Sequence, residues 1–461
     1  MKKILCMLSL ALALNASDAL TLEEAIEILQ KNNLEIESAA YDVDIAANDL
    51  ESASGAHWGS LDFTQDFARS NDAGNVFGFK LASREAAFGD FGFNEFIGQM
   101  DTITPGSPTF DGGTKLLATQ PDDLNYPEAR NFFQSKLKYQ VPLFTGFAIT
   151  SYEQITESVK RLKSLEKEQV MSEKIFELKK AYYDMGLLLD SITNLEKILS
   201  NIATLENVTS EMIDEGYAKK VDLLEVQAKK GNVERLLAQM SANKKLLYHY
   251  ISFLLNKEVN TISAPREIIA MPLSSDSDAL KNNLDIQKAA TGLEIKKSML
   301  SADEAAYYPT LGAFAEVSTA DDTFLGDAND HKAYTVGARL SWNLFNGGVD
   351  AAKIEKSKLE HMKMQSQVEL ARKGIELQFA KIKTEIESVD VEIASLEKEL
   401  DLARAIYSNY LGRYKEKLSS MSDVIMKQTE EIQKTLELQM AKNSRNEKIF
   451  ALEKLVNGER K

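Results

Sequence analysis

Apolar residues recur at helical spacing along two long stretches of the chain. In the second stretch, apolar positions follow one another in alternating steps of four and three residues from Ile375 to Tyr414, and similar steps run from Leu178 to Ile202. This heptad pattern predicts coiled-coil packing, although a simple dimeric rod remains an alternative on periodicity alone. We expect two long helices and two returning helices, over about 146–214, 221–256, 348–417 and 422–458.

The eight prolines avoid these stretches. None lies between Pro142 and Pro265, and none follows Pro309. An interior proline costs a helix about 3 kcal/mol, so their absence supports long uninterrupted helices. About 70 residues separate Gly146 from Gly216, which corresponds to a helix on the order of 100 Å long. Such a helix is far longer than the thickness of a membrane.

The chain is an internal duplication. Lys31–Ile36 recurs as Lys281–Ile286 at an offset of 250 residues, and Pro142–Gly146 matches Asn343–Gly347 at an offset of 201. The second offset also aligns Asp222 with Asp423. We therefore divide the chain into a first repeat, an equatorial link and a second repeat, over 20–260, 261–275 and 276–461.

Each repeat also holds two segments with strand-like alternation. The clearest places Tyr334, Val336, Leu340 and Trp342 on one face. Period-two segments of this length fit tilted membrane-spanning strands, although soluble hairpins remain an alternative. Four strands cannot close a barrel, and open edges are not tolerated in lipid, so the chain must form an oligomer. The expected strands lie over about 57–69, 131–143, 308–319 and 332–344.

The first residues have the features of a signal peptide. Lys2 and Lys3 precede an apolar stretch that ends at Leu14, and small residues follow at Ala16 and Ala19. We expect an exported protein whose signal, residues 1–19, is cleaved after Ala16 or Ala19. No later segment offers 18 consecutive apolar residues, so a membrane would have to be crossed by strands.

Composition excludes several classes of function. The chain has 54 Lys+Arg against 70 Asp+Glu, a net charge of −16, which argues against a nucleic-acid partner. Cys6 is the single cysteine, and the four histidines lie far apart. Disulfides, thiolate metal sites and HExxH-type sites are therefore excluded. We expect no enzyme, no catalytic residue, no cofactor and no metal.

The junctions between strands and long helices identify a family resemblance. The VPLFTGF-like and WNLFNGG-like junctions, together with Leu22–Ile26 followed by Asn32-Asn33-Leu34, resemble the TolC family of outer membrane channels. The resemblance implies an α+β membrane protein. Three chains of four strands each would form one 12-stranded β-barrel in the outer membrane lipid, continued by an α-helical coiled-coil tunnel in the periplasm.

The same resemblance implies a function and partners. The homotrimer would be the exit duct of a tripartite efflux pump for drugs, toxic compounds or metal ions. It would work with a periplasmic adaptor protein and an inner-membrane transporter. The alternatives are the outer membrane component of a type I protein secretion system and a periplasmic coiled-coil scaffold without a pore.

The resemblance further assigns a periplasmic gate. Asp222 and Tyr414 match an aspartate and a tyrosine that hold the tip closed in this family, while Ser419 stands at the position of a basic residue. Arg413 or Lys415 could replace that residue. Asp423 matches an aspartate of the aperture ring, where three carboxylates would favour cations and crowding would raise their pKa. Helix N-capping is the alternative for both aspartates.

Three further sets of residues complete the expected sites. The turns between the long and returning helices would contact the adaptor or transporter through Gly216, Tyr217, Lys219, Lys220, Lys417, Leu418 and Ser420. The strand–helix junctions comprise Pro142, Phe144, Gly146, Phe345, Gly347 and Gly348, whose glycines permit sharp turns. The aromatic segment over 71–125 would fold over the pore mouth, or alternatively would extend the strands and end in a mobile tip.

Overall fold

The computed structural model describes residues 19–265, 269–271, 281–324, 326, 330–416 and 418–456. The expected signal peptide, apart from Ala19, lies outside the described residues. Lys417, most of the second half of the expected equatorial link and the end of the last helix also lie outside them.

The chain divides into two compact units. The helical unit comprises the residues up to Ala47, Glu157–Ile295 and the residues from His361, and the sheet unit comprises Asn48–Thr156 and Lys296–Glu360. Several helices run from one unit into the other, so each unit contains segments from both sequence repeats.

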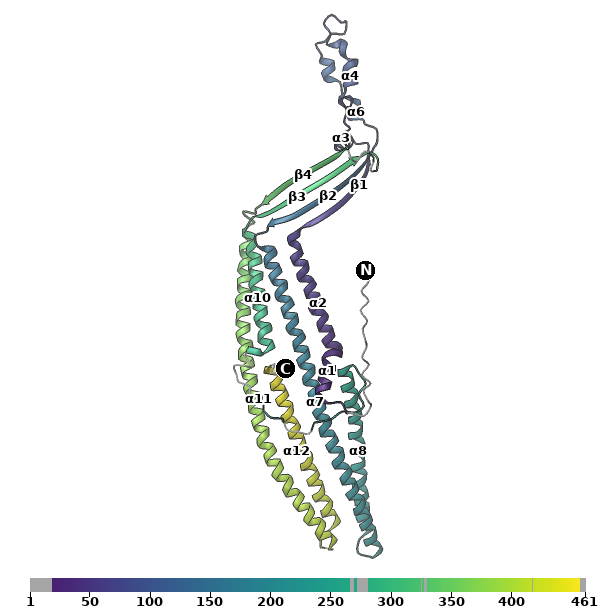
Figure 1. The fold of residues 1–461 in the computed structure, drawn as a ribbon, viewed down its shortest axis with the longest axis vertical. Coiled ribbons are helices and arrows are strands. Elements are labelled where there is room, and N and C mark those ends of the chain that lie inside the picture. Colours follow the sequence, from purple (N-terminus) through teal and green to yellow (C-terminus); the bar gives the residue numbers. More distant parts are fainter. Residues whose placement is uncertain are drawn as a thin grey trace, which may run out of the picture. The chain divides into compact units, whose positions relative to one another are not determined.

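The principal helices come in matched sets (Figure 1). The long helices α7 and α11 have 67 residues each, and the returning helices α8 and α12 have 36 each. The described helices offer no stretch that is long and apolar enough to cross a membrane. The helix bounds are α1 (Leu22–Asn32), α2 (Leu34–Gly55), α7 (Ala148–Asp214), α8 (Lys220–Leu255), α10 (Leu284–Glu304), α11 (Val349–Lys415) and α12 (Met421–Val456).

These bounds differ by one or two residues from those expected. The long helices begin later than 146 and 348 because Gly146 and Gly348 have positive φ angles, 62° and 84°, and so belong to the preceding turns. The heptad positions are buried or half-buried, as their spacing predicts. Ile375, Phe379 and Ile386 pack with the end of α12 in one apolar cluster.

Asn33 and its repeat counterpart Asn283 show the duplication in three dimensions. Asn33 Nδ2 donates to Leu254 O at 2.8 Å, and its Oδ1 accepts from the next helix's amides, Glu35 N at 3.0 Å and Ile36 N at 3.1 Å. Asn283 makes the same three hydrogen bonds, with Leu455 O, Asp285 N and Ile286 N. Each asparagine caps a helix and fastens it to the end of the returning helix of its own repeat.

The sheet has four antiparallel strands in the order β1-β2-β3-β4. They are β1 (Ser60–Ser70), β2 (Arg130–Phe144), β3 (Thr310–Asp321) and β4 (Lys332–Ser341). The first strand begins later than expected because the 3-10 turn η1 (Ala56–Trp58) and Gly59, with φ of 70°, precede it. A Cβ on Gly59 would lie 1.8 Å from Gln140 O, so only glycine fits. The last strand ends before Trp342, three residues earlier than expected.

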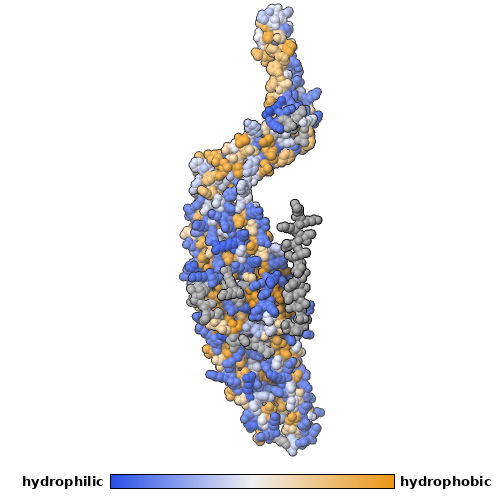
Figure 2. Space-filling view, in the orientation of Figure 1, coloured by the Kyte–Doolittle hydropathy of each residue, from blue (hydrophilic) through white to orange (hydrophobic). Residues whose placement is uncertain are grey.

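The strand register sorts the side chains of the sheet into two chemically different faces. Alternate residues of every strand share a face, and the pairing aligns these sets across the sheet. One face carries exposed apolar side chains, namely Leu61, Phe63, Phe67, Leu137, Tyr139, Val317, Tyr334, Val336 and Leu340. We call this the apolar face, and apolar residues are visible over the sheet in Figure 2.

The opposite face is polar and hollowed. Its polar residues are Ser60, Asp62, Thr64, Asp66, Gln134, Lys136, Lys138, Gln140, Glu316, Ser318, Thr335 and Arg339. A hollow of about 400 Å³ on this polar face is bordered by Lys138, Gln140, Glu316 and Arg339. The sheet is therefore amphipathic along all four strands.

The segment between β1 and β2 contains short helices and turns, so the alternative of extended strands over 71–125 is wrong. The helices are α3 (Ala73–Ala82), α4 (Phe93–Gly98), α5 (Thr114–Ala118) and α6 (Asp122–Asn125), with 3-10 turns η2 (Phe88–Phe91) and η3 (Met100–Thr102). Helix α3 packs on β2 and β3, and Phe79 stacks on Phe132 with ring centroids 4.3 Å apart. We call residues 71–129 the insertion.

Candidate functional site

The turn between α7 and α8 is closed by backbone hydrogen bonds. Gly216 has φ of 78°, and the amides of Tyr217 and Ala218 donate to Met212 O at 2.7 and 3.1 Å. These bonds satisfy a carbonyl that the helix end leaves free, in the manner of a glycine C-cap. The turn leaves the Tyr217 side chain 61% exposed. The expected contact residues Gly216 and Tyr217 thus lie in a hydrogen-bonded, accessible turn.

Asp222 and Asp423 both act as helix caps. The Asp222 carboxylate accepts a hydrogen bond from Lys219 N at 2.8 Å at the start of α8. The Asp423 carboxylate accepts from Ser420 N at 3.2 Å and from Ser420 Oγ at 2.6 Å, while Asp423 N donates to Ser420 Oγ at 3.2 Å. This reciprocal arrangement is a capping box. Capping, the alternative reading from sequence, is therefore observed for both aspartates.

The charge of Asp423 is stabilised within its own turn. The hydrogen bonds from the Ser420 hydroxyl and amide lower the pKa of Asp423, with smaller contributions from Arg413 and Lys427. This differs from the expectation of a raised pKa, because that expectation depended on crowding by other copies of the chain. Asp423 is thus held as a half-buried anion in the first turn of α12, beside Ser420.

Tyr414 lies in the core of the tip. Its side chain is buried in an apolar cluster that includes Leu205, Val226 and Met421, so it joins all four tip helices. Its hydroxyl contacts Met212 Sδ at 3.3 Å. Within one chain the Asp222 carboxylate caps α8 and the Tyr414 hydroxyl meets a sulfur, and the role of both residues in a gate stays a prediction. No motif or spacing in the sequence marks Met212 as the contact of Tyr414.

Ser419 and Arg413 form hydrogen bonds within the turn between α11 and α12. Ser419 Oγ donates to Tyr410 O at 3.3 Å, and Arg413 Nη2 donates to Leu418 O at 3.4 Å. The Arg413 guanidinium also lies over the Tyr410 ring, 5.7 Å from its centroid. Arg413, one candidate for the missing basic residue, therefore stabilises its own turn.

The remaining tip residues form an exposed rim. Lys219, Lys220 and Ser420 are exposed at the helix starts, and Leu418 is also exposed. The large apolar side chains of the neighbouring residues Val221 and Leu224 are also exposed. Lys417, the other expected contact, lies outside the described residues.

The strand–helix junctions are sharp turns in both repeats. Pro142 and Phe144 lie at the end of β2, at an irregularity in its pairing with β3. A Cβ on Gly146 would lie 2.7 Å from Ala305 O, so this position requires glycine both for its φ and for space. Phe147, which the sequence reasoning missed, also has a positive φ and packs edge-on against Phe144 and Tyr308.

The second junction is more open. Phe345 is exposed, and the positive φ angles of Gly347 and Gly348, 71° and 84°, make the turn into α11. A Cβ on either glycine would meet no atom within 4 Å. Backbone conformation alone therefore explains these two glycines.

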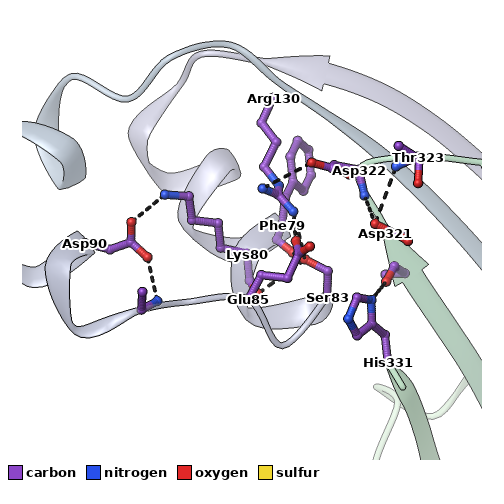
Figure 3. Close-up of polar contacts among 12 residues, drawn as sticks. Phe79, Lys80, Ser83, Glu85, Asp90, Arg130, Asp321, Asp322, Thr323 and His331 are labelled. Atoms are coloured by element: carbon purple, nitrogen blue, oxygen red, sulfur yellow. Dashed lines mark hydrogen bonds and ion pairs between the residues drawn. The ribbon is translucent and has the colours of Figure 1, made fainter. Parts of the chain in front are cut away.

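A polar cluster joins the insertion to the strand ends (Figure 3). Arg130 forms ion pairs with Glu85 and, at 3.6 Å, with Asp322, and it donates to Ser83 Oγ at 3.2 Å. Carboxylate oxygens of Glu85, Asp321 and Asp322 lie within 4.8 Å of one another, a spacing that could suit a metal ion. The Arg130 guanidinium already pairs with two of these three carboxylates, so we interpret the cluster as an ion-pair contact that fastens the insertion.

Comparison with known proteins agrees with this geometry. The family model described as outer membrane efflux protein matches residues 277–458. Among solved structures, CusC matches at 12% identity with a TM-score of 0.77, covering 94% of this chain and 91% of its own. VceC from Vibrio cholerae matches at 14% identity with a TM-score of 0.75, covering 94% and 95%. The outer membrane channel CmeC of Campylobacter jejuni matches at 12% identity with a TM-score of 0.74, covering 95% and 85%. No curated protein gives a significant sequence match.

The fold is that of outer membrane channels with long helical tunnels. The family match covers the second repeat and the fold extends over the whole chain, so the resemblance to the TolC family is confirmed. This is a family of passive channels of the outer membrane rather than of enzymes.

Proposed function

We propose that the protein is the outer membrane exit duct of a tripartite efflux pump and acts as a homotrimer. The observation that carries this proposal is the amphipathic sheet, which has exposed apolar residues on one face and a hollowed, charged face opposite. In a membrane barrel, apolar residues face lipid and polar residues face a water-filled lumen. The free edges of β1 and β4 would cost several kcal/mol for each unpaired group in lipid, so further copies must pair with them.

In this proposal the helical unit forms the tunnel in the periplasm. Its surface is largely hydrophilic in the view of Figure 2, as a periplasmic surface requires. Transport is passive, and the inner-membrane transporter supplies the energy. Small molecules, such as drugs, toxic compounds or metal ions, pass through the duct.

We assign the gate and the partner contacts to the tips. Three copies of Asp423 around the tunnel axis would favour cations, since each carboxylate is kept ionised by Ser420. The exposed rim that contains Tyr217, Val221, Leu224 and Leu418 would receive the adaptor or the transporter. Burial of such apolar side chains is the main favourable term in most protein association.

A pair of neighbouring substitutions tests the membrane assignment of the sheet. Val336 and Thr335 follow one another on β4, with Val336 on the apolar face and Thr335 on the polar face. Lysine on the lipid face of a barrel costs about 2–4 kcal/mol near the middle of the bilayer. We expect Val336→Lys to reduce insertion into the outer membrane strongly and Thr335→Lys to leave it intact, as measured by membrane fractionation. Equal effects would contradict the proposal.

Channel function is tested with the purified wild-type protein. We expect a trimer mass in detergent by light scattering and single-channel conductance in planar lipid bilayers. A correctly assembled trimer without conductance would instead support a periplasmic scaffold. Deletion of the gene should increase drug or metal sensitivity, whereas loss of a secreted protein with unchanged sensitivity would identify type I secretion.

A further inference from the structure

The two edge strands of the sheet carry opposite charges on the polar face. On β1 this face presents Asp62 and Asp66, and on β4 its charged residue is Arg339. Arg339 is exposed and has no hydrogen bond or ion pair within the described part of the chain. The two free edges are therefore electrostatically complementary to each other.

Charges on the two inner strands have partners or opposite-charge neighbours within the chain. Lys136 pairs with Glu316 at 3.6 Å. Lys138 lies opposite Asp62 on one side and opposite Glu316 on the other. Arg339 is thus the cation of the polar face that lies farthest from the aspartates of β1 in its own chain.

We propose that, where β4 of one copy meets β1 of the next in the trimeric duct, Arg339 lies between Asp62 and Asp66 of the partner subunit. This inference rests on the proposed trimeric duct. The charges select the pairing of β4 with β1 of the next copy. Pairing β1 with β1 would bring aspartates together, and pairing β4 with β4 would bring arginines together, both of which are destabilising. Selection of unlike edges produces a head-to-tail ring rather than a two-fold dimer.

The stagger of the strands gives the register. Through the three pairings of one chain, Ser60 aligns with Gly337, four residues before the end of β4. The strands therefore slip by four residues over three pairings. In a ring closed by rotation, every β1 begins at the same height. The same average slip gives about 5.3 residues after a fourth pairing, and the nearest even number, which keeps like faces together, is six. Thr335 then lies opposite Ala68 of the partner subunit.

In this register Arg339 lies opposite Thr64 of the partner subunit. Asp62 and Asp66 of the partner subunit are its two diagonal neighbours. Diagonal neighbours lie about 7–8 Å apart, within reach of a long side chain. Because such pairs would face a water-filled lumen, their effect is on the choice and orientation of the partner more than on total stability.

Disulfide crosslinking between copies tests the register. In a Cys6→Ser background, the pair Thr335→Cys/Ala68→Cys should crosslink trimers in the outer membrane. The pairs Ser341→Cys/Ser60→Cys and Ser341→Cys/Thr64→Cys lie directly opposite only if the register moves by two residues either way. We expect roughly tenfold less crosslinking from these two pairs, because disulfides require Cα atoms within about 7 Å. None of the five cysteine substitutions replaces a charged residue.

Charge exchange tests the role of Arg339. We expect Arg339→Glu to reduce the Thr335/Ala68 crosslink severalfold and Arg339→Glu with Asp62→Lys and Asp66→Lys to restore it. Lys115→Glu, the same charge change in α5, should have no effect. The inference would be overturned if crosslinking were unchanged in Arg339→Glu, if the added substitutions did not rescue it, or if an alternative pair gave more crosslinked product. In each of these cases the protein would still be a trimer in detergent. Absence of any wild-type trimer would instead refute the proposed function.

Discussion

Replacement of Asn33 by alanine removes three hydrogen bonds from a site that is 4% exposed. A hydrogen bond contributes about 1 kcal/mol net, and loss of an N-cap side chain alone typically costs about 1 kcal/mol. We therefore expect Asn33→Ala to destabilise the junction of α1, α2 and α8 by about 3 kcal/mol. Asn283→Ala should cost a similar amount, since its three bonds are equivalent.

Amide hydrogen exchange measures this loss locally. The amides of Glu35 and Ile36 donate to the Asn33 side chain, so their protection reports the cap directly. A loss of about 3 kcal/mol corresponds to roughly 100-fold faster exchange if these amides open by local unfolding. Thermal unfolding followed by circular dichroism at 222 nm gives the global effect.

Asn32→Ala is the matched control. Asn32 is the exposed neighbour of Asn33 at the end of α1, and an exposed substitution of this kind changes stability by about 0.5 kcal/mol or less. Asn32 and Asn33 are adjacent in sequence and identical in chemistry, so any difference arises from burial and bonding. Equal protection in the two variants would refute the reasoning that the buried cap stabilises the junction.

Three other outcomes follow from the tips and the insertion. Tyr414→Ala should lower the free energy of unfolding by about 3–5 kcal/mol, because it leaves a cavity among the tip helices, and it should raise basal conductance. Tyr414→Phe should keep both properties near wild type. Equal increases in basal conductance in the two variants would assign closure to the hydroxyl rather than to packing. Asp423→Ala should weaken cation selectivity in bilayers, and Asp222→Ala, which also loses a cap, should not. Equal changes in selectivity would mean that both aspartates act only as helix caps. The Lys80 ammonium, 2.5 Å from Asp90, lowers the pKa of Asp90, so its stabilisation of the insertion is present above the ordinary carboxyl pKa of about 3.9 and is lost as pH falls further. Acid-protease cleavage of the insertion should therefore rise below about pH 4 in the wild type but depend less on pH in Lys80→Met, and identical pH profiles would contradict this contribution.

Much of the fold could be predicted because the relevant forces act locally along the chain. The heptad positions, the absence of proline and the two offsets were enough to predict paired long and returning helices. The strands were weaker signals, and their ends differ from those expected because Gly59 precedes β1 and Trp342 follows β4. The short helices of the insertion were missed because its phenylalanines show no helical or strand periodicity.

The candidate site was predicted less well than the fold. Asp222, Asp423 and Tyr414 were identified from the family resemblance, and the duplication aligned the two aspartates with each other. Their contacts could not be inferred, because a carboxylate near a helix start accepts a hydrogen bond from the nearest free amide. The partner of Tyr414 depends on how α7 and α11 pack.

The sequence by itself determined the duplication, the helical regions and the family resemblance, since these depend on periodicity and on the order of short motifs. Tertiary structure decided which groups meet. It brought Asn33 to the last turn of α8, buried Tyr414 against Met212, and aligned the aspartates of β1 with one polar face. The physical reason is that a repeat pattern fixes which face of a helix or strand is apolar, whereas the contacts across that face depend on register and packing between segments distant in the chain.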